Sequence, residues 1–175
     1  EGSYALAEEM IGQAAEAGAD AVKFQTIVPS KLVSIKQTER IKQLSKFQLS
    51  NKDFINLADV AKKQNIIFLS TPFDIESAIF LNDFVPAFKI ASGDNNFFPL
   101  IKSVAKTGKP LIMSTGLMSF DEVEKSTLFI KDIWKKNYIK QELALLHCVS
   151  SYPTLPEEVN LLAIKQLKKL SNIIG

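Results

Sequence analysis

Ala19-Asp20-Ala21-Val22-Lys23-Phe24-Gln25-Thr26 is the stretch of sequence that decides the fold. It is a short apolar run, typical of a buried parallel strand, with a lysine and a glutamine set into it. Alternation along a strand places Val22 and Phe24 on one face, and Lys23 and Gln25 on the other. A lysine in such a run loses hydration unless an anion pairs with it. One face of this strand is therefore predicted to pack, and the other to bind a polar ligand.

Similar apolar runs recur along the chain, each preceded or followed by apolar residues at helical spacing. The expected strands cover residues 21–25, 66–70, 87–91, 111–114 and 143–147, with an incipient strand at 173–175. The expected helices cover residues 3–17, 51–64, 74–83, 97–107, 120–136 and 158–170. Residues 27–50 are expected to be irregular, apart from a short helix at 38–46. Strands that alternate with helices in this way predict an α/β fold with a parallel sheet.

The absence of a Gly-rich dinucleotide fingerprint after any strand favours a (β/α)8 TIM barrel over a Rossmann fold. Such barrels usually need about 250 residues, and this chain has 175. We therefore expect an incomplete TIM-barrel catalytic domain over residues 1–175. It would contain about five βα units, with the first strand and the last units missing, and its strands would form one curved sheet.

Composition sets outer limits on the class of protein. The chain is 46% hydrophobic and 23% charged, as in ordinary soluble globular proteins. The net charge of +2 is too small to indicate nucleic acid or an anionic membrane as a partner. No apolar run reaches the roughly 18 residues of a membrane span. Cys148 is the only cysteine, so no internal disulfide is possible, and a cytoplasmic location is expected.

Polar residues gather at the ends of the predicted strands, where the sites of βα barrels lie. They are Lys23, Gln25 and Thr26; Ser70 and Thr71; Lys89, Ser92 and Asp94; Ser114 and Thr115; and His147, Ser150 and Tyr152. Two lysines with several hydroxyls suit a small dianion, such as a phosphate or a phosphorylated carboxylate. Structural interpretations also exist, because serine and threonine often cap helices and a single lysine often forms an ion pair. His147 is expected to be structural, since no second metal ligand stands at a suitable spacing.

Five motifs at these positions resemble the sialic acid synthase (N-acetylneuraminate synthase) family, in order and over nearly the whole chain. They are Ala-Gly-Ala-Asp-Ala-Val-Lys-Phe-Gln-Thr at 17–26, Ser-Thr-Pro-Phe-Asp at 70–74, Phe-Lys-Ile-Ala-Ser-Gly-Asp at 88–94, Gly-Lys-Pro-Leu-Ile-Met-Ser-Thr-Gly at 108–116 and Leu-Leu-His-Cys-Val-Ser-Ser-Tyr-Pro-Thr at 145–154.

The resemblance implies condensation of phosphoenolpyruvate with an N-acetylated amino sugar, such as N-acetylmannosamine or a bacterial 2,4-diacetamido sugar. The products would be a sialic-acid-like nine-carbon 2-keto acid and phosphate. It also implies residue roles. Phosphoenolpyruvate would be held by Lys23, Thr71, Lys89, Ser92, Ser114 and Ser150, and the sugar would contact Gln25 and Tyr152. Asp94 would lie near the reacting centre, with Lys23 and Lys89 as the other catalytic residues.

The resemblance places other parts of the family's machinery outside this segment. A first strand with a sugar-binding glutamate would precede Glu1, and two metal-binding histidines and an antifreeze-like domain would follow Gly175. We therefore expect no metal ligands within these residues, and a divalent metal, Mn2+ or Mg2+, in the full-length protein. The full-length protein is expected to be a homodimer, and this segment alone is expected to be inactive.

Two alternatives remain open. The first is a class I aldolase in which Lys89 forms a Schiff base. It needs a lysine that is desolvated away from anions, whereas Lys23 and the nearby hydroxyls suit anion binding. The second is a non-catalytic barrel that serves as a binding module.

Overall fold

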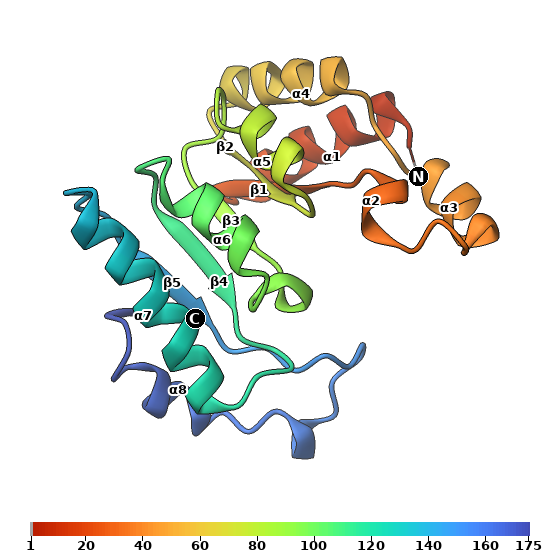
Figure 1. The fold of residues 1–175 in the computed structure, drawn as a ribbon. Coiled ribbons are helices and arrows are strands. Elements are labelled where there is room, and N and C mark those ends of the chain that lie inside the picture. Colours follow the sequence, from red (N-terminus) through yellow and green to blue (C-terminus); the bar gives the residue numbers. More distant parts are fainter. Residues whose placement is uncertain (1) are drawn as a thin grey trace. The chain divides into compact units, whose positions relative to one another are not determined.

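The computed structural model describes residues 2–175 and divides into two compact units, the first ending at Pro86 and the second beginning at Ala87 (Figure 1). Unit 1 contains α1 (Tyr4–Glu16), β1 (Ala21–Thr26), α2 (Pro29–Leu32), α3 (Thr38–Ser45), α4 (Asn51–Lys63), β2 (Ile67–Pro72) and α5 (Ile75–Leu81). Unit 2 contains β3 (Phe88–Ile90), the 3-10 turn η1 (Ser92–Asp94), α6 (Phe98–Ala105), β4 (Leu111–Ser114), α7 (Phe120–Lys136), β5 (Leu143–Leu146), the 3-10 turn η2 (Pro156–Glu158), α8 (Ala163–Leu167) and β6 (Ile173–Ile174).

Unit 1 is built on the parallel pair β1–β2, in which Lys23 lies opposite Leu69 and Gln25 opposite Thr71. Helices α1 and α4 pack against each other, and α4 and α5 both contact β2. Helix α4 begins with a capping box, in which the Ser50 side chain accepts from the Asp53 N–H and the Asp53 carboxylate accepts from the Ser50 N–H. The core of the unit is aliphatic and aromatic, and includes Ile11, Phe54, Leu57, Phe68 and Leu81.

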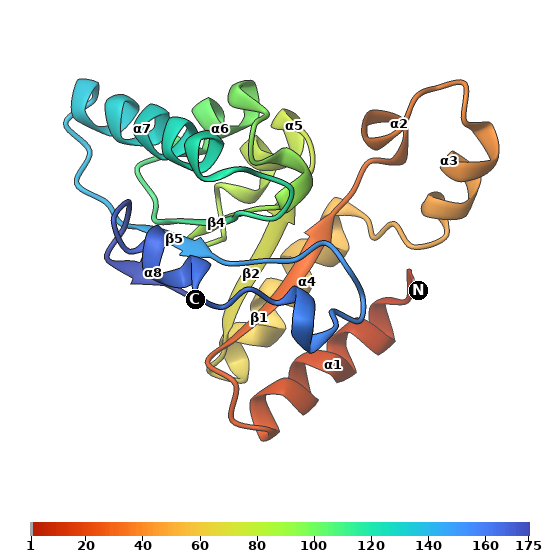
Figure 2. The same cartoon turned by 90° about the horizontal axis from the view of Figure 1, so that it is seen from below.

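Residues 27–50 are more ordered than the sequence suggested. The short helix predicted at 38–46 is confirmed as α3, and α2 precedes it. Pro29 occupies the first turn of α2, where its missing N–H costs nothing, and it is buried. Helix α3 has no buried residue. In both views α3 lies at the edge of unit 1, and α2 lies between it and the end of β1 (Figures 1 and 2).

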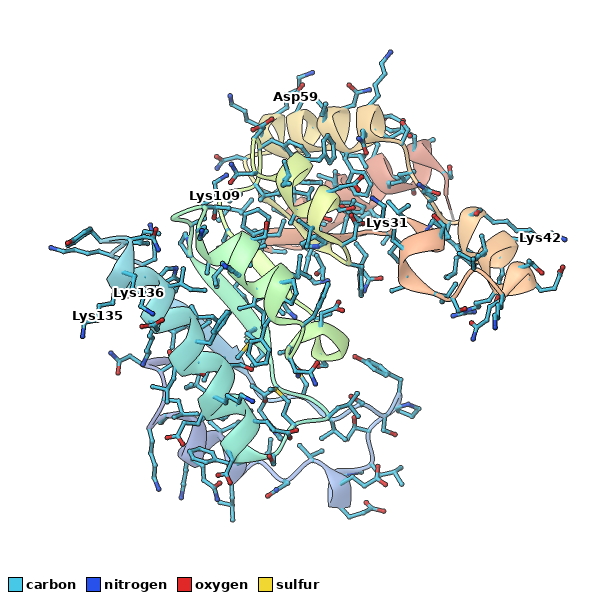
Figure 3. All side chains as sticks on the ribbon, in the orientation of Figure 1. Lys31, Lys42, Asp59, Lys109, Lys135 and Lys136 are labelled. Carbon is cyan, nitrogen blue, oxygen red and sulfur yellow. The ribbon has the colours of Figure 1, made fainter. Side chains whose placement is uncertain are left out.

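Unit 2 is built on the parallel sheet β3-β4-β5-β6, and α6 and α7 pack against each other beside it. Trp134 on α7 donates its indole N–H to the Ala105 carbonyl at the end of α6, 3.0 Å away. Ser119 and Glu122 form the capping box of α7, and Lys135 and Lys136 in its last turn complement the helix dipole (Figure 3). Apolar side chains from the strands and both helices form one core around these contacts.

Two expectations about the architecture need correction. The described strands form two sheets, β1-β2 and β3-β4-β5-β6, rather than one curved sheet. Strand β3 has only three residues. The helix predicted at 158–170 is the short α8, preceded by η2. Asn160 adopts a left-handed backbone conformation with φ 45°, which interrupts the expected helix.

None of the helices in residues 2–175 has the length and apolar character needed to cross a membrane.

Candidate functional site

Strand β1 presents two polar side chains on its more exposed face. Lys23 and Gln25 are exposed, while Val22 and Phe24 on the opposite face are half-buried, and the Phe24 ring stacks on Phe68 with centroids 5.5 Å apart. Although Lys23 is exposed as a whole residue, partial burial of its ammonium group lowers the Lys23 pKa, because burial disfavours the charged form. The predicted division of β1 into a packing face and a polar face is confirmed.

The end of β2 places Thr71 beside Gln25. The two residues are register partners in the parallel ladder, so their side chains emerge on the same face. Thr71 is buried. Ser70 belongs to the other face, where its hydroxyl lies 2.8 Å from that of Thr26. Unit 1 thus groups Lys23, Gln25 and Thr71, and separates Ser70 and Thr26 from them.

An ion-pair network joins the α2–α3 segment to the start of α5. Asp74 is the N-cap of α5, and its Oδ1 accepts from the Ser77 N–H at 3.0 Å. The Lys31 ammonium on α2 lies 3.5 Å from Asp74 Oδ1 and 2.5 Å from Glu76 Oε2 (Figure 3). Burial works against the Asp74 charge, but the Ser77 hydrogen bonds and Lys31 together lower the pKa of this carboxyl. The network fixes α2 next to the turn that follows Thr71.

In unit 2, Lys89 is the buried cation of the candidate site. It is 8% exposed, in the middle of the apolar strand β3. Its ammonium group donates to the Ser114 hydroxyl at 2.6 Å and to the Ile90 carbonyl at 2.7 Å. The bond to Ser114 joins β3 to the carboxyl end of β4, so these two predicted site residues lie together.

The hydroxyls of Ser92 and Ser150 meet beside Gly116. A methyl group built on the Gly116 Cα would lie 2.8 Å from Ser92 Oγ and 3.0 Å from Ser150 Oγ. Ser92 belongs to the turn after β3, Gly116 follows β4 and Ser150 follows β5. Three loops at the carboxyl ends of neighbouring strands therefore converge on one place. Together with Lys89 and Ser114, these two serines form what we call the Lys89 cluster.

Asn95 holds two of these loops together, and the sequence analysis missed it. Its side chain is buried, and its amide group donates to the Ser114 carbonyl at 3.2 Å and to the Gly116 carbonyl at 2.8 Å. The Ser126 hydroxyl on α7 donates to the Asn95 carbonyl at 2.9 Å. The partners of the Asn95 side chain are backbone carbonyls about 20 positions along the chain, and no local sequence pattern reveals such contacts. The only available signal was a polar residue next to the Ser-Gly-Asp motif.

Asp94 carries a carboxylate that its surroundings do not compensate. Its Oδ2 atom is buried and has no hydrogen-bond partner among residues 2–175. Burial raises the Asp94 pKa, because the charged form loses hydration. An uncompensated acid in a turn that also carries Ser92 is typical of a functional position.

Two further predicted residues, His147 and Tyr152, follow β5, and the structure does not place either in the Lys89 cluster. Tyr152 is 97% exposed, so within unit 2 the structure does not bring its ring to the Lys89 cluster. His147 has a structural contact, with Nε2 2.6 Å from the Val159 carbonyl. Residues 2–175 include no group of three histidine, cysteine, aspartate or glutamate side chains able to hold a metal ion. The described residues thus do not by themselves fit a metal centre.

Comparison with known proteins gives a consistent result. The model of the NeuB family matches residues 10–174. An uncharacterized protein of Methanocaldococcus jannaschii, MJ1065, is 42% identical over 173 residues, which cover 98% of this chain and 50% of that protein. The N,N'-diacetyllegionaminic acid synthase of Campylobacter jejuni is 36% identical over 181 residues, covering 95% of this chain and 53% of the synthase. The chain spans about half the length of the curated relatives it matches.

Among solved structures, the N-acetylneuraminic acid synthetase of Leptospira borgpetersenii in complex with citrate is similar, with a TM-score of 0.90 and 34% identity. The match covers 99% of this chain and 59% of the synthetase.

Proposed function

The chain belongs to the NeuB family, and from that premise we propose that the full-length protein condenses phosphoenolpyruvate with an N-acetylated amino sugar. The products are a nine-carbon 2-keto acid of the sialic acid type and inorganic phosphate. Similar proteins are named legionaminic acid, pseudaminic acid and N-acetylneuraminate-9-phosphate synthases. The acceptor class is taken from those names and from the sequence motifs.

The observation that carries the proposal is the Lys89 cluster in unit 2. It combines a buried ammonium group with the hydroxyls of Ser92, Ser114 and Ser150, at the carboxyl ends of parallel strands. A buried cation bonded to one hydroxyl, with two more hydroxyls on adjacent strand-end loops, is suited to an anion with several oxygens, such as a phosphoryl group. The similar synthetase of Leptospira borgpetersenii was solved with citrate, itself a small polyanion.

The chemistry proceeds in two bond-forming steps. C3 of phosphoenolpyruvate attacks the aldehyde carbon of the open-chain sugar, and water adds at C2. The resulting tetrahedral intermediate expels phosphate with cleavage of the C–O bond. Lys89 neutralises negative charge on the phosphoryl group throughout, and the serine hydroxyls hold the group in place. Fixed charges and dipoles of this kind stabilise charge that develops in the transition state.

The other sequence-based assignments form part of the same proposal. Lys23 and Thr71 on unit 1 contribute to phosphoenolpyruvate binding, Gln25 and Tyr152 contact the sugar, and Asp94 acts near the reacting centre. As the family resemblance implies, the divalent metal, Mn2+ or Mg2+, is bound by residues outside this segment. The full-length protein is proposed to be a cytoplasmic homodimer with an antifreeze-like domain.

The test is release of phosphate from phosphoenolpyruvate by the full-length protein. N-acetylmannosamine, a 2,4-diacetamido sugar, erythrose 4-phosphate and arabinose 5-phosphate are compared as acceptors. Release with an N-acetylated amino sugar is expected. Release only with a sugar phosphate would contradict the proposed acceptor class.

The same preparation separates the two rival functions. A class I aldolase would be trapped covalently at Lys89 by borohydride in the presence of substrate, and a non-catalytic barrel would release no phosphate with any acceptor. The structure argues against the aldolase. The hydrogen bonds from the Lys89 Nζ to Ser114 and Ile90 stabilise the ammonium form, whereas a Schiff base requires the neutral amine.

A further inference from the structure

We propose that Gly116 and Asn95 are the positioning residues of the phosphoryl subsite, a role that rests on the proposed function. Gly116 allows two serine hydroxyls from separate loops to reach one ligand, and Asn95 fixes the loop that carries Gly116. Neither residue needs to touch the ligand through a side chain of its own. Both act indirectly, by fixing the positions of the Ser92 and Ser150 hydroxyls in the Lys89 cluster.

The steric part of the argument concerns Gly116. A Cβ atom there would come within 2.8 Å of Ser92 Oγ, 3.0 Å of Ser150 Oγ and 3.2 Å of Ser92 Cβ. Heavy atoms of non-bonded groups do not approach a Cβ this closely, so any side chain at position 116 forces both serines to move. Glycine is therefore required here by the close approach of the two hydroxyls, and its backbone is not in the left-handed region.

The clash falls on the ends of short side chains rather than on backbone. A serine hydroxyl can turn to another staggered rotamer at small cost, and the 3.2 Å approach to Ser92 Cβ needs only a shift of a few tenths of an ångström, so the fold is expected to accept a methyl group at position 116. The hydroxyls would then point away from their common ligand position. Gly116→Ala is therefore expected to weaken phosphoenolpyruvate binding while the protein stays folded. If Gly116 were needed only for the fold, the variant would lose stability instead.

The second part concerns the anchor of this loop. Asn95 donates to the carbonyl groups of Ser114 and Gly116, and its own carbonyl accepts from Ser126. All the side chains in this network are buried, so each hydrogen bond is shielded from water. The network ties the turn carrying Ser92 and Asp94 to the loop carrying Gly116. It therefore fixes the turn that carries Ser92 against the loop that follows Ser114.

The third part of the argument concerns Ser150. Ser150 comes from the long connection after β5, whose backbone has little regular structure apart from η2. Its hydroxyl would lie 3.0 Å from a Cβ at position 116, so the missing side chain of Gly116 leaves room for it there. Productive geometry at a binding centre has to be held within about 0.5 Å, so a displacement of one serine is enough to weaken the site.

The experiment compares Gly116→Ala with Gly12→Ala in the full-length protein. A methyl group at Gly12 on α1 meets nothing within 4 Å, so Gly12→Ala controls for the added carbon. Phosphoenolpyruvate affinity is measured by calorimetry well below the melting temperature, and the crystal structure of Gly116→Ala is determined. Gly116→Ala is expected to raise the Kd at least 30-fold, with the protein folded and both serine hydroxyls displaced. Gly12→Ala is expected to leave the Kd unchanged.

Asn95→Ala and Ser126→Ala provide the second arm. Asn95→Ala leaves two buried carbonyl groups without a donor and is expected to raise the phosphoenolpyruvate Kd at least 10-fold. Ser126→Ala removes only the outer bond and is expected to raise it less than threefold. The pair distinguishes loop position from general loss of stability, because affinity is measured on the folded protein in each case.

The outcomes separate this inference from the proposed function. If wild-type protein does not bind phosphoenolpyruvate, the proposed function fails, and the positions of the Ser92 and Ser150 hydroxyls in the Gly116→Ala crystal structure decide the packing argument. An unchanged Kd in Gly116→Ala, or serine hydroxyls that stay in place, would overturn the inference. Equal loss of affinity in Gly12→Ala would overturn it as well.

Discussion

Replacement of Lys89 by methionine removes the buried charge of the site while keeping most of the side-chain volume. Lys89 is 8% exposed, and its ammonium group donates to the Ser114 hydroxyl and to the Ile90 carbonyl. Truncation of one member of a buried charge pair costs about 2–5 kcal/mol of binding free energy. At 1.4 kcal/mol per tenfold change, the phosphoenolpyruvate Kd of Lys89→Met should rise from roughly 30-fold to several thousand-fold.

The free energy of unfolding of the ligand-free protein should change much less. Two hydrogen bonds from a charged donor contribute about 1.5–3 kcal/mol each. Their loss is offset by removal of a buried ion, whose desolvation penalty is several kcal/mol. We therefore expect the unfolding free energy of Lys89→Met to stay within about 2 kcal/mol of the wild type.

Calorimetric titration with phosphoenolpyruvate and thermal melts, with and without ligand, measure both quantities. Lys102→Met is the matched control, because Lys102 is an exposed lysine on the neighbouring helix α6. The control should bind phosphoenolpyruvate as the wild type does. The reasoning is refuted if Lys89→Met melts far below the wild type yet keeps the full ligand-induced increase in melting temperature.

Further predictions concern the other charged groups. Lys23→Met should raise the phosphoenolpyruvate Kd and leave the ligand-free melting temperature level or slightly higher, because the folded state disfavours the Lys23 charge; a large fall in melting temperature would contradict this. Lys31→Met should speed amide hydrogen exchange in residues 27–46, because it removes the ion pairs of α2 with Asp74 and Glu76. Lys42→Met, which removes only an exposed pair with Glu39, should not. Equal exchange rates in the two variants would contradict the proposed role of Lys31 in holding α2. Asp94→Asn should raise the melting temperature near pH 7, because the raised pKa means that folding stability declines as pH rises above the ordinary value of 3.8. That gain should disappear in melts at pH 3, where the carboxyl is protonated in both states.

The elements that the sequence predicted best are those whose own residues determine them. Strand β1 could be read from alternation, because Val22 and Phe24 need a core while Lys23 does not. The helix predicted at 74–83 starts at the right place, because Asp74 is a residue type that favours the N-cap and its carboxylate accepts from the Ser77 N–H. The shortened α8 was missed, because nothing in its apolar spacing showed that Asn160 adopts a left-handed conformation.

The sequence predicted the charged and hydroxyl groups of the candidate site, but not the residues that position them. Lys89 and Ser114 were identified because a lysine in an apolar strand and a hydroxyl at a strand end are unusual enough to stand out. Asn95 contacts backbone carbonyls some 20 positions away, and Gly116 acts through the space that it leaves empty. Contacts of this kind depend on the tertiary fold, which a single sequence does not encode in any local pattern.

The central claim is that phosphoenolpyruvate binds at the Lys89 cluster, and a crystal structure of the full-length protein with phosphoenolpyruvate tests it most directly. The account predicts the phosphoryl group within hydrogen-bonding distance of the Lys89 ammonium group and of the Ser92 and Ser150 hydroxyls, beside Gly116. Phosphoenolpyruvate bound elsewhere, with the Lys89 ammonium group making no contact to it, would contradict the claim.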